Sequence, residues 1–401
     1  MVHVAALYSP KAKLWVEGRK QIWHHISYSL NPNEKRIWIH CASLGEFEQG
    51  RPVLEFLKKH YPAQKIVLTF FSPSGYEKKK HEPLADYVFY LPNDTVRNAR
   101  KFIALIQPHF AVFVKYEFWH NYIYEAAQKQ IPMVYISVLL RPNHYLFKFY
   151  SVWFRNNLSK VSAFLVQDEK TKELLKNIGI EQVVVTGDTR FDRVLQIASA
   201  TERIPEIETF KSGKKLWIAG SSWAKDESVI APVFERLSKD YKLLIVPHEV
   251  GDLRIQEIEA TFNRFKCLRF TAFNHSEAEE ADVLIVNTIG LLSRLYRYAD
   301  LAYIGGAFGK GLHNILEAAV FGVPVIFGPH IRKFPEAQGL INAGGGFSIA
   351  NSQELTSVME RLNSNNAHQE AGACARKFIE NHQGATLKVT DFIVSSCFER
   401  L

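Results

Sequence analysis

A glutamate and a run of small residues follow the first predicted strand, where they could remove a proton from a hydroxyl group. The segment reads WIHCASLGE at 38–46, and Glu46 falls where an amphipathic helix should begin. A carboxylate at a helix start is favoured by the helix dipole by roughly 0.3–1 kcal/mol, so capping is one interpretation. The other is a general base that takes the proton of a sugar hydroxyl. Both interpretations stay open on these residues alone.

A glycine-rich segment, GGAFGKGLHNILE at 305–317, follows another predicted strand. Glycines let backbone amides approach an anion closely, which predicts a phosphate cradle, although a tight turn needs the same residues. The segment has neither the GxxxxGK[ST] order of a P-loop nor GxGxxG, so an ATPase or dehydrogenase is not supported. His313, Asn314 and Glu317 should share one helical face, where the carboxylate could accept ribose hydroxyls.

Polar residues also follow other predicted strands, and each has a structural alternative. Serine is a favoured N-cap, so Ser221 and Ser222 could be helix caps. A buried carboxylate needs partners, so an ion pair between Glu117 and Arg141 would account for both residues. The candidate contacts to phosphate or acceptor are Ser43, Gly45, Ser74, Glu117, Arg141, Arg190, Ser221, Ser222, Arg254, Gly306 and Lys310.

The elements that must position these residues form two series of βα units, which predicts parallel sheets. Ligands of such sheets bind beyond the carboxyl ends of the strands, in a cleft where two domains face each other. We predict a first domain at 1–196, a linker at 197–213, a second domain at 214–380 and a final helix at 381–401 that packs back on the first domain. The predicted strands are 36–42, 65–71, 87–91, 110–116, 133–138, 163–167 and 183–186, then 216–219, 242–246, 266–271, 283–287, 301–304, 323–327 and 346–349.

The bulk composition agrees with two folded domains. The chain has 401 residues, of which 47% are hydrophobic and 22% charged. Cys41, Cys267, Cys374 and Cys397 lie far apart and are expected to be reduced core thiols. No apolar run approaches the ~18 residues that a membrane span needs.

The net charge of +8 suggests an anionic partner. At the N-terminus, lysines and arginines alternate with aromatic residues, which predicts a face that lies flat on an anionic membrane, with solvated surface as the alternative. The residues of this face are Lys11, Lys13, Trp15, Arg19, Lys20, Trp23 and Tyr28.

Taken together, the ordered segments resemble the 3-deoxy-D-manno-octulosonic acid (Kdo) transferases of lipopolysaccharide biosynthesis. The resemblance is carried by HCASLGE at 40–46, FSPSGYE at 71–77, KYEFWHN at 115–121, VTGDTRFD at 185–192, AGSS at 219–222, NTIGLL at 287–292, GGAFGKGLHNILEAA at 305–319 and GVPVIFGPH at 322–330.

The resemblance implies a GT-B fold of two Rossmann-like domains and an inverting, metal-independent transfer of Kdo from CMP-Kdo to a lipid A precursor, lipid IVA, without a cofactor. Glu46 takes the role of the base. By the same resemblance, the domain at 1–196 would bind the acceptor and the domain at 214–380 the nucleotide-sugar. The nucleotide side would use Pro247, His248, Thr288, Ile289, Gly290, Asn314 and Glu317.

The chain also departs from its family. Members often carry arginine where this chain has His248, so Arg254 or Lys310 is expected to contact the phosphate instead. Members tend to begin with a membrane helix, and this sequence starts near where such an anchor would end, which suggests a missing anchor. We therefore expect a peripheral protein on the cytoplasmic face of the inner membrane that does not bind nucleic acid.

Two other classes remain open on sequence. One is a different GT-B enzyme, such as a UDP-sugar transferase or a sugar-nucleotide epimerase, which would share the glycine-rich loop and the ribose-binding glutamate. The other is a catalytically inactive basic protein that binds nucleic acid or a membrane surface. Binding of UDP-sugars but not of CMP would indicate the first class rather than a Kdo transferase. A protein of the second class would release no CMP from CMP-Kdo.

Overall fold

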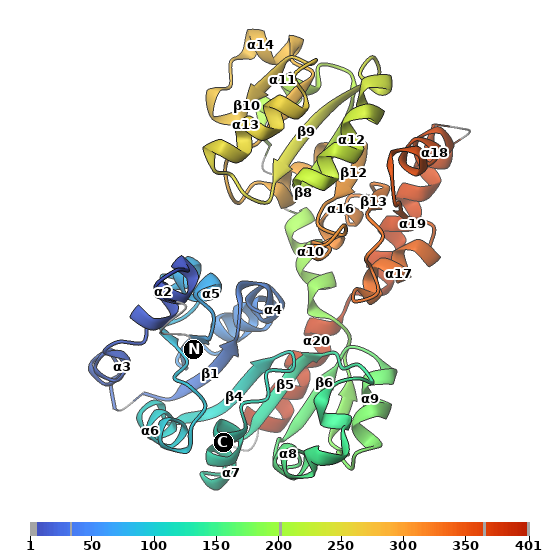
Figure 1. The fold of residues 1–401 in the computed structure, drawn as a ribbon. Coiled ribbons are helices and arrows are strands. Elements are labelled where there is room, and N and C mark those ends of the chain that lie inside the picture. Colours follow the sequence, from blue (N-terminus) through green and yellow to red (C-terminus); the bar gives the residue numbers. More distant parts are fainter. Residues whose placement is uncertain (1–5, 33, 200–202, 364–365, 399–401) are drawn as a thin grey trace. The chain divides into compact units, whose positions relative to one another are not determined.

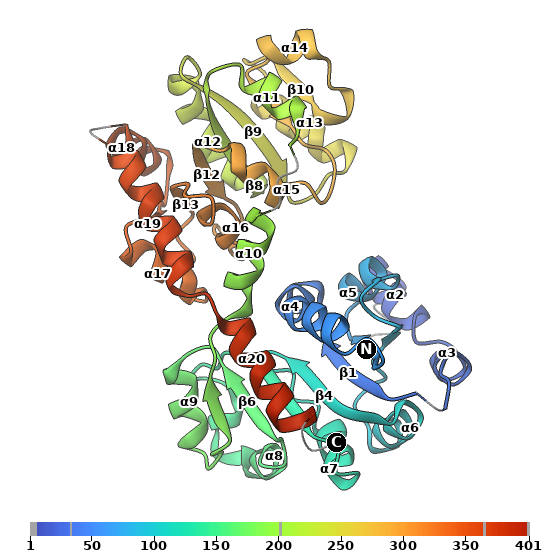
Figure 2. The ribbon, with the colours of Figure 1, turned by 180° about the vertical axis from the view of Figure 1, so that it is seen from behind.

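The computed structural model describes residues 6–32, 34–199, 203–363 and 366–398. The chain forms two compact units (Figures 1 and 2). Unit 1 consists of the described residues within Met1–Arg193 and Gln383–Leu401, and unit 2 of those within Val194–His382. Each unit is a parallel sheet covered by helices, so each is described by itself.

The sheet of unit 1 has seven strands in the order β3-β2-β1-β4-β5-β6-β7. All six residues of β1 are buried, as expected for a parallel sheet that is covered on both faces. The strands are β1 Arg36–Cys41, β2 Lys65–Phe70, β3 Tyr87–Tyr90, β4 Pro108–Val114, β5 Met133–Val138, β6 Ala163–Val166 and β7 Val183–Val185.

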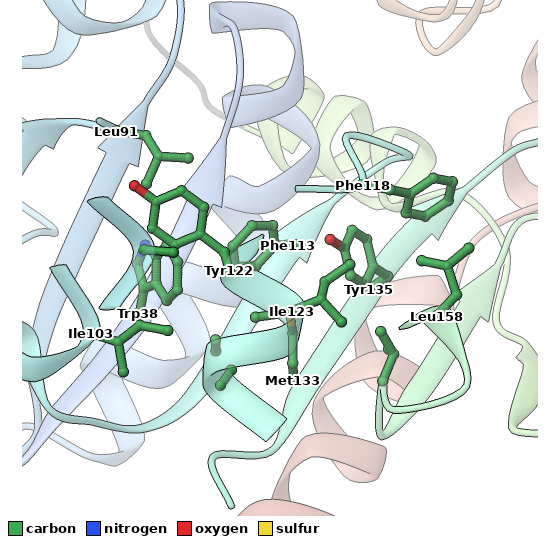
Figure 3. Packing of buried hydrophobic residues seen from close by; sticks show 14 of the residues in the cluster. Trp38, Leu91, Ile103, Phe113, Phe118, Tyr122, Ile123, Met133, Tyr135 and Leu158 are labelled. Carbon is green, nitrogen blue, oxygen red and sulfur yellow. The ribbon is translucent and has the colours of Figure 1, made fainter. Parts of the chain in front are cut away.

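Aromatic side chains fill one side of this sheet (Figure 3). Trp38 packs edge-on against Phe113 and Tyr122, with ring centroids 4.8 and 5.6 Å apart. The described helices of unit 1 are α2 Pro10–Glu17, α3 Ile22–Ser29, α4 Leu44–His60, α5 Pro73–Lys79, α6 Val96–Ile106, α7 His120–Gln128, η1 Tyr145–Phe147, η2 Phe149–Ser151, α8 Val152–Leu158, α9 Glu169–Lys176, α20 Ala385–Ile393 and the π-helical η5 Val394–Phe398. Helix α10, Thr189–Ser199, contains the boundary between the units.

Unit 2 repeats the architecture with the strand order β10-β11-β9-β8-β12-β13-β14. Trp217, Phe234 and Tyr303 lie in its core. Its strands are β8 Lys215–Ser222, β9 Tyr241–Pro247, β10 Cys267–Arg269, β11 Val283–Ile285, β12 Leu301–Ile304, β13 Val325–Phe327 and β14 Gly346–Ser348. Its described helices are α11 Pro205–Lys211, α12 Ala224–Leu237, α13 Asp252–Thr261, η3 Phe270–Ala272, α14 His275–Glu280, α15 Leu292–Leu295, η4 Tyr296–Tyr298, α16 Leu316–Ala319, α17 Pro335–Asn342, α18 Ser352–Leu362 and α19 Ala367–Asn381.

Every predicted strand is present, with ends that differ by a few residues. The largest difference is at β8, which extends three residues beyond its predicted end at 219, and at 270–271 a 3₁₀ turn replaces the predicted end of a strand. Helix α11 occupies much of the predicted linker at 197–213 and buries Ile207 and Phe210. Unit 1 also ends at Arg193, three residues before the predicted boundary at 196.

The last helix, α20, belongs to unit 1 although unit 2 precedes it in the chain (Figure 2). Val389 and Ile393 are buried in the same core cluster as Ile37 and Phe47. Asp192 fixes the helix start, because its carboxylate accepts the backbone N–H groups of Gly384 and Thr386, each at 2.6 Å. The C-terminal segment thus completes the first core.

The expected membrane face at the N-terminus is only partly available. Trp23 packs against the core, and Trp15 meets Phe71 edge-on at 5.9 Å. Arg19 lies over the rings of Trp15, Phe71 and Tyr90, and burial lowers its pKa to about 10. These three side chains serve the fold, which corrects part of that prediction. Tyr28 and the lysines remain exposed.

The cysteine prediction needs a smaller correction. Cys41 is a buried free thiol, but Cys267 and Cys374 are only half-buried. The side chain of Cys397 lies outside the described residues. Among the described residues, no helix is both long and apolar enough to cross a membrane.

Candidate functional site

Glu46 lies in the first turn of α4, directly after β1. Ser43 is the N-cap residue of that helix, and the Glu46 carboxylate accepts the backbone N–H of Ala42. Only 7% of Glu46 is exposed. The capping interpretation is therefore correct for this carboxylate, and it does not exclude the catalytic one, because the same contact holds the group in place.

The surroundings raise the pKa of Glu46 to about 7. Burial is the largest cause, and the charge of Glu117 adds to it. Lys115 and the N–H groups of Ala42 and Ser43 act in the opposite direction. A general base works best when its pKa lies near the working pH, so a carboxylate with this pKa would suit proton transfer near neutrality.

The carboxyl ends of β1 and β4 bring a small charged group together. Lys115 follows β4 in the left-handed backbone region, with φ of 64°, a conformation that costs a non-glycine residue free energy and recurs at functional sites. Burial raises the pKa of Glu117, and the charge that opposes this rise is that of Lys115. Lys115 is thus a cation that acts on Glu117, and the expected Glu117–Arg141 pair stays a prediction. Arg141 acts on the neighbouring Tyr116, as does Glu46.

A buried hydrogen-bonded chain at the end of β1 was missed by the sequence reasoning. Trp119 Nε1 donates to His40 Nε2 at 3.0 Å, and His40 Nδ1 lies 2.9 Å from Thr69 Oγ1. Burial lowers the pKa of His40 to about 3, so the ring stays neutral. His40 therefore ties the end of β1 to the loop that carries Glu117. His40 is the first residue of the HCASLGE segment, and this position was the sequence signal that could have identified it.

Several predicted contacts of unit 1 lie at the same edge. Gly45 is exposed, and a Cβ atom there would meet nothing within 4 Å. Ser74 is exposed at the start of α5, where its backbone N–H donates to Ser72 Oγ. Neither residue is needed for packing, so their predicted role as ligand contacts stays a prediction.

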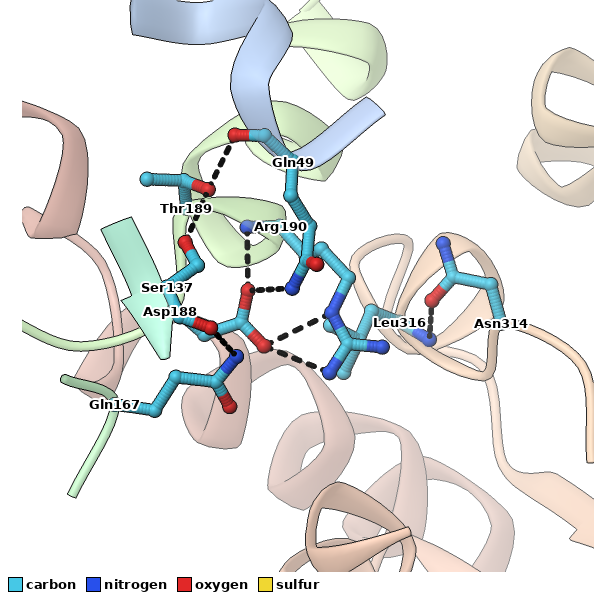
Figure 4. A network of polar contacts seen from close by, with 8 residues as sticks. All are labelled: Gln49, Ser137, Gln167, Asp188, Thr189, Arg190, Asn314 and Leu316. Carbon is cyan, nitrogen blue, oxygen red and sulfur yellow. Dashed lines mark hydrogen bonds and ion pairs between the residues drawn. The ribbon is translucent and has the colours of Figure 1, made fainter. Parts of the chain in front are cut away.

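Arg190 belongs to a buried polar network (Figure 4). Its Nε and Nη2 donate to Asp188 Oδ2 at 2.8 and 2.7 Å, and Gln49 Nε2 donates to Asp188 Oδ1 at 3.0 Å. Burial acts to raise the pKa of Asp188, but Arg190 and these hydrogen bonds hold that pKa below its ordinary value. Thr189 links the network to Gln49 O at 2.6 Å. Arg190 thus joins α10 to α4, and its predicted phosphate contact stays untested.

In unit 2, a stack of rings stands at the ends of β8 and β9. His248 is stacked between Trp223 and His313, with centroids 4.8 and 4.5 Å away and interplanar angles of 26°. Burial and the neighbouring His248 lower the pKa of His313 to about 4. Lys310 Nζ lies 5.2 Å from the Trp223 ring centroid. The predicted His248 and Lys310 are thus brought together by Trp223, which the sequence reasoning did not select.

The glycine-rich loop is not the amide cradle that the sequence predicted. The backbone N–H groups of Gly309, Lys310 and Gly311 all donate to Gly306 O at 2.9–3.1 Å. The N–H of Gly306 donates to Asp226 Oδ2 at 3.0 Å. A Cβ at Gly306 would lie 2.2 Å from Gly311 O, and its φ is 93°. The steric interpretation is therefore correct for Gly306, and four N–H groups of the loop are already bonded within the protein.

Asp226 organises this loop from the first turn of α12. Besides Gly306, its carboxylate accepts the backbone N–H of Trp223 at 2.9 Å and the hydroxyl of Tyr303 at 2.9 Å. A pocket of about 420 Å³ opens beside it. The pocket is lined by Trp223, Ala224, Lys225, Asp226, Gly306, Phe308, Gly309 and Lys310.

Ser221, Ser222 and Arg254 have structural roles that differ from the predicted ones. Both serines lie in β8, and Trp223 is the N-cap of α12, so the capping prediction was wrong. Ser222 Oγ donates to the buried Glu227 at 2.7 Å, and Arg254 forms an ion pair with the same carboxylate. This pairing makes Arg254 the weaker candidate for a phosphate contact, and Lys310 the better one.

The predicted ribose site is assembled just before a short helix. Asn314 Nδ2 donates to Glu317 Oε1 at 2.9 Å, and Asn314 Oδ1 accepts the backbone N–H of Leu316 at 3.3 Å. Because α16 begins at Leu316, His313 and Asn314 precede the helix rather than share its face, which corrects the prediction. Asn314 nevertheless bonds to the helix start through Leu316 and Glu317.

The segment after β11 carries the predicted nucleotide contacts Thr288, Ile289 and Gly290, which stay predictions. The hydroxyl of Thr288 is buried with no hydrogen-bond partner among the described residues, whereas Ile289 is 74% exposed. Gly290 has φ of 95° and nothing near its missing Cβ. Pro247 ends the neighbouring β9. Within the described ranges, no three histidine, cysteine or acidic side chains are grouped as a metal site would require.

Comparisons with known sequences identify relatives over most of the chain. Residues 17–193 match the family described as 3-deoxy-D-manno-octulosonic-acid transferase (kdotransferase). The chain is 32% identical over 318 residues to the 3-deoxy-D-manno-octulosonic acid transferase of Chlamydophila psittaci, which covers 77% of this chain and 73% of the relative. The transferase of the same description from Haemophilus influenzae is 27% identical, over 90% of this chain and 87% of the relative.

Solved structures share the two-sheet architecture. A putative UDP-N-acetylglucosamine 2-epimerase from Listeria monocytogenes matches with a TM-score of 0.65 and 15% identity over 92% of this chain and 98% of its own. A glycosyltransferase from Rickettsia africae matches with a TM-score of 0.59 and 12% identity over 92% and 100%. These likenesses show the fold, which is GT-B. The sequence relatives define the class as a glycosyltransferase, and the chain belongs to the 3-deoxy-D-manno-octulosonic acid transferase family.

Proposed function

We propose that the chain transfers Kdo from CMP-Kdo to a lipid A precursor, lipid IVA, with Glu46 as general base. The observation that carries the proposal is the buried Glu46 carboxylate, with its pKa near 7, on the strand end of unit 1. Direct displacement with inversion needs one base for the acceptor hydroxyl, and a carboxylate that is part-ionised at neutral pH suits this role.

The donor would be held by unit 2. The Asn314–Glu317 pair offers acceptors to the ribose hydroxyls, and the unpartnered Thr288 hydroxyl offers a contact to the nucleotide. Lys310 would meet the phosphate, because the N–H groups of Gly306, Gly309, Lys310 and Gly311 are already bonded within the protein. No step of this scheme uses a metal or cofactor, and metal independence remains part of the proposal.

A product assay tests the whole proposal. The protein is incubated with CMP-Kdo, the tetra-acylated precursor in detergent micelles and excess EDTA, and products are followed by mass spectrometry. We expect the precursor to gain the mass of one or more Kdo residues and CMP to be released in equal amount. CMP release without acceptor gain would point to hydrolysis, and no release would refute the proposal.

The fold likeness to UDP-sugar epimerases keeps one alternative in view. Titration calorimetry with CMP and UDP separates the two enzyme classes. We expect heat of binding with CMP and none with UDP at equal concentration. Binding of UDP alone would favour a UDP-sugar enzyme instead.

A further inference from the structure

Unit 1 carries an exposed aromatic surface that the proposed chemistry does not use. We call it the aromatic surface and define it by Tyr145, Phe149, Tyr150, Val152 and Trp153. Phe149 is 88% exposed and Trp153 is 65% exposed. Exposed aromatic residues gathered on one short segment typically mark an interaction site.

The local backbone holds these rings outward. Arg155 Nε and Nη2 donate to Leu146 O and Lys148 O at 2.7 and 2.8 Å. Ser151 Oγ donates to Tyr145 O at 2.6 Å. Leu146 is buried and anchors the segment to the core of unit 1. The turns of η1 and η2, which lead into α8 (Figure 1), are thus fixed by their own contacts, and the exposure of the rings is a feature of the fold.

The charge around the aromatic surface has one sign. No aspartate or glutamate occurs from residue 126 to residue 167, a stretch that contains Lys129, Arg141, Lys148, Arg155 and Lys160. Lys148 and Lys160 are exposed. Trp and Tyr favour the membrane interface, and basic residues beside them are attracted to anionic headgroups. The combination complements an anionic bilayer.

A chain of rings connects the aromatic surface with the neighbourhood of Glu46. The charges of Glu46 and Arg141 act on the hydroxyl of Tyr116, and the ring centroids of Tyr116 and His144 lie 6.1 Å apart. His144 lies 4.5 Å from Tyr145, and Tyr145 lies 5.8 Å from Phe154 next to Trp153. All these residues belong to unit 1, so the surface and the carboxylate are held on one rigid support.

We propose that the aromatic surface docks unit 1 on an anionic bilayer and so places the lipid acceptor next to Glu46. The lipid acceptor in this statement rests on the proposed function, whereas bilayer binding does not. The N-terminal aromatic residues are poorer candidates, because Trp15 and Trp23 pack within unit 1.

Vesicle binding by the full chain tests this proposal. Co-sedimentation is measured with vesicles of phosphatidylethanolamine and phosphatidylglycerol, and with phosphatidylcholine alone. We expect the wild type to bind the anionic vesicles. The double variant Phe149→Ser/Trp153→Ser should bind them at least about tenfold more weakly than the wild type, and Lys148→Glu roughly tenfold more weakly. Leu253→Ser and Tyr28→Ser, which remove exposed apolar side chains elsewhere, should bind as the wild type does.

A second readout locates the contact. Brominated phosphatidylglycerol should quench part of the tryptophan emission of the wild type, and Trp153→Phe should lose that part. The proposal would be overturned if the wild type did not bind the vesicles or if the double variant bound them as well as the wild type does. Loss of binding in Tyr28→Ser would also overturn it. So would a change in sedimentation coefficient of the double variant without vesicles, since the surface would then cover a second copy or unit 2.

Transfer in detergent micelles separates this proposal from the proposed function. There the acceptor reaches the protein without a bilayer, so the double variant should turn over CMP-Kdo within about twofold of the wild type, a change far below what loss of a catalytic group causes. If the wild type transfers no Kdo in micelles, the proposed function fails, and the vesicle results still decide the aromatic surface.

Discussion

The surroundings of Glu46 show how one carboxylate can serve as a structural cap and also suit the proposed role of a base. Its carboxylate accepts the Ala42 N–H at the start of α4, yet burial and Glu117 raise its pKa to about 7. Ionising a carboxyl group in this environment costs free energy that the fold must supply. The residue should therefore limit stability at the same pH at which it works.

This cost predicts a pH-dependent effect of Glu46→Gln on stability. The folded-state pKa lies above the ordinary value of 4.5, so between these pH values the folded state binds more protons than the unfolded state. Wild-type stability should fall as pH rises through this window, by on the order of 2–3 kcal/mol. Glu46→Gln should thus gain stability over the wild type at pH 8 but not at pH 4.

Urea unfolding of both proteins at pH 4 and 8 checks this effect. Hydrogen exchange in β1 and α4 identifies the transition that belongs to unit 1. A difference between the two proteins that is the same at both pH values would show that Glu46 is not desolvated as described.

Gly45 provides a test of where the acceptor approaches. A methyl group there meets no atom of the protein within 4 Å, so Gly45→Ala should leave the melting temperature nearly unchanged. If the acceptor hydroxyl reaches Glu46 along this side, KM for the lipid acceptor should rise several-fold, because added volume excludes ligand atoms. Gly251→Ala, at another open glycine, is the matched control. Equal KM values for both variants would place the acceptor elsewhere.

Lys310 is the corresponding test for the donor. It stands over Trp223 at the rim of the pocket, whereas Arg254 is held by Glu227. Losing a charge-assisted contact to phosphate should weaken CMP binding by roughly tenfold or more in Lys310→Ala. Lys239→Ala, an exposed lysine of the same unit, should bind CMP normally in the same calorimetric titration.

At the scale of elements, the strands were predictable because parallel strands are short, continuous apolar runs. The whole of β1 and β9 is buried, and both stand out in the sequence for that reason. Loop interiors were not predictable. Nothing local in the glycine-rich segment shows that Gly306 O accepts three backbone N–H groups. Nor does it show that Asp226, eighty residues away, accepts the N–H of Gly306. The ring stack on His248 likewise joins residues from three separate loops.

Helix α20 gives a prediction at this scale. Asp192 accepts two backbone N–H groups at its start, so Asp192→Ala should destabilise unit 1 by about 2–4 kcal/mol through two lost charge-assisted bonds. Hydrogen exchange should speed up in 385–393 and in the strands that pack on Val389 and Ile393. Asp192→Asn, which keeps one acceptor, should lie between. Unchanged exchange in α20 would show that the helix is held by its apolar face alone.

At the scale of the whole molecule, chemistry is divided between the two units. Unit 1 carries the buried base and the aromatic surface, and unit 2 carries the pocket, the ring stack and the Asn314–Glu317 pair. The sequence predicted this division from the order of the βα units. It could not predict that the C-terminal helix returns to unit 1 with Asp192 as its anchor, since that contact spans the length of unit 2.

The central claim is that Glu46 acts as the base, and the pH dependence of turnover tests it most directly. With saturating CMP-Kdo and acceptor in micelles, the kcat of the wild type should rise about tenfold per pH unit below 7 and level off above it, because the base must be deprotonated. Glu46→Gln should lower kcat by roughly 10² to 10⁴ and remove the rise, while CMP binding stays as in the wild type. A Glu46→Gln enzyme with wild-type turnover, or with the same pH profile, would contradict the account.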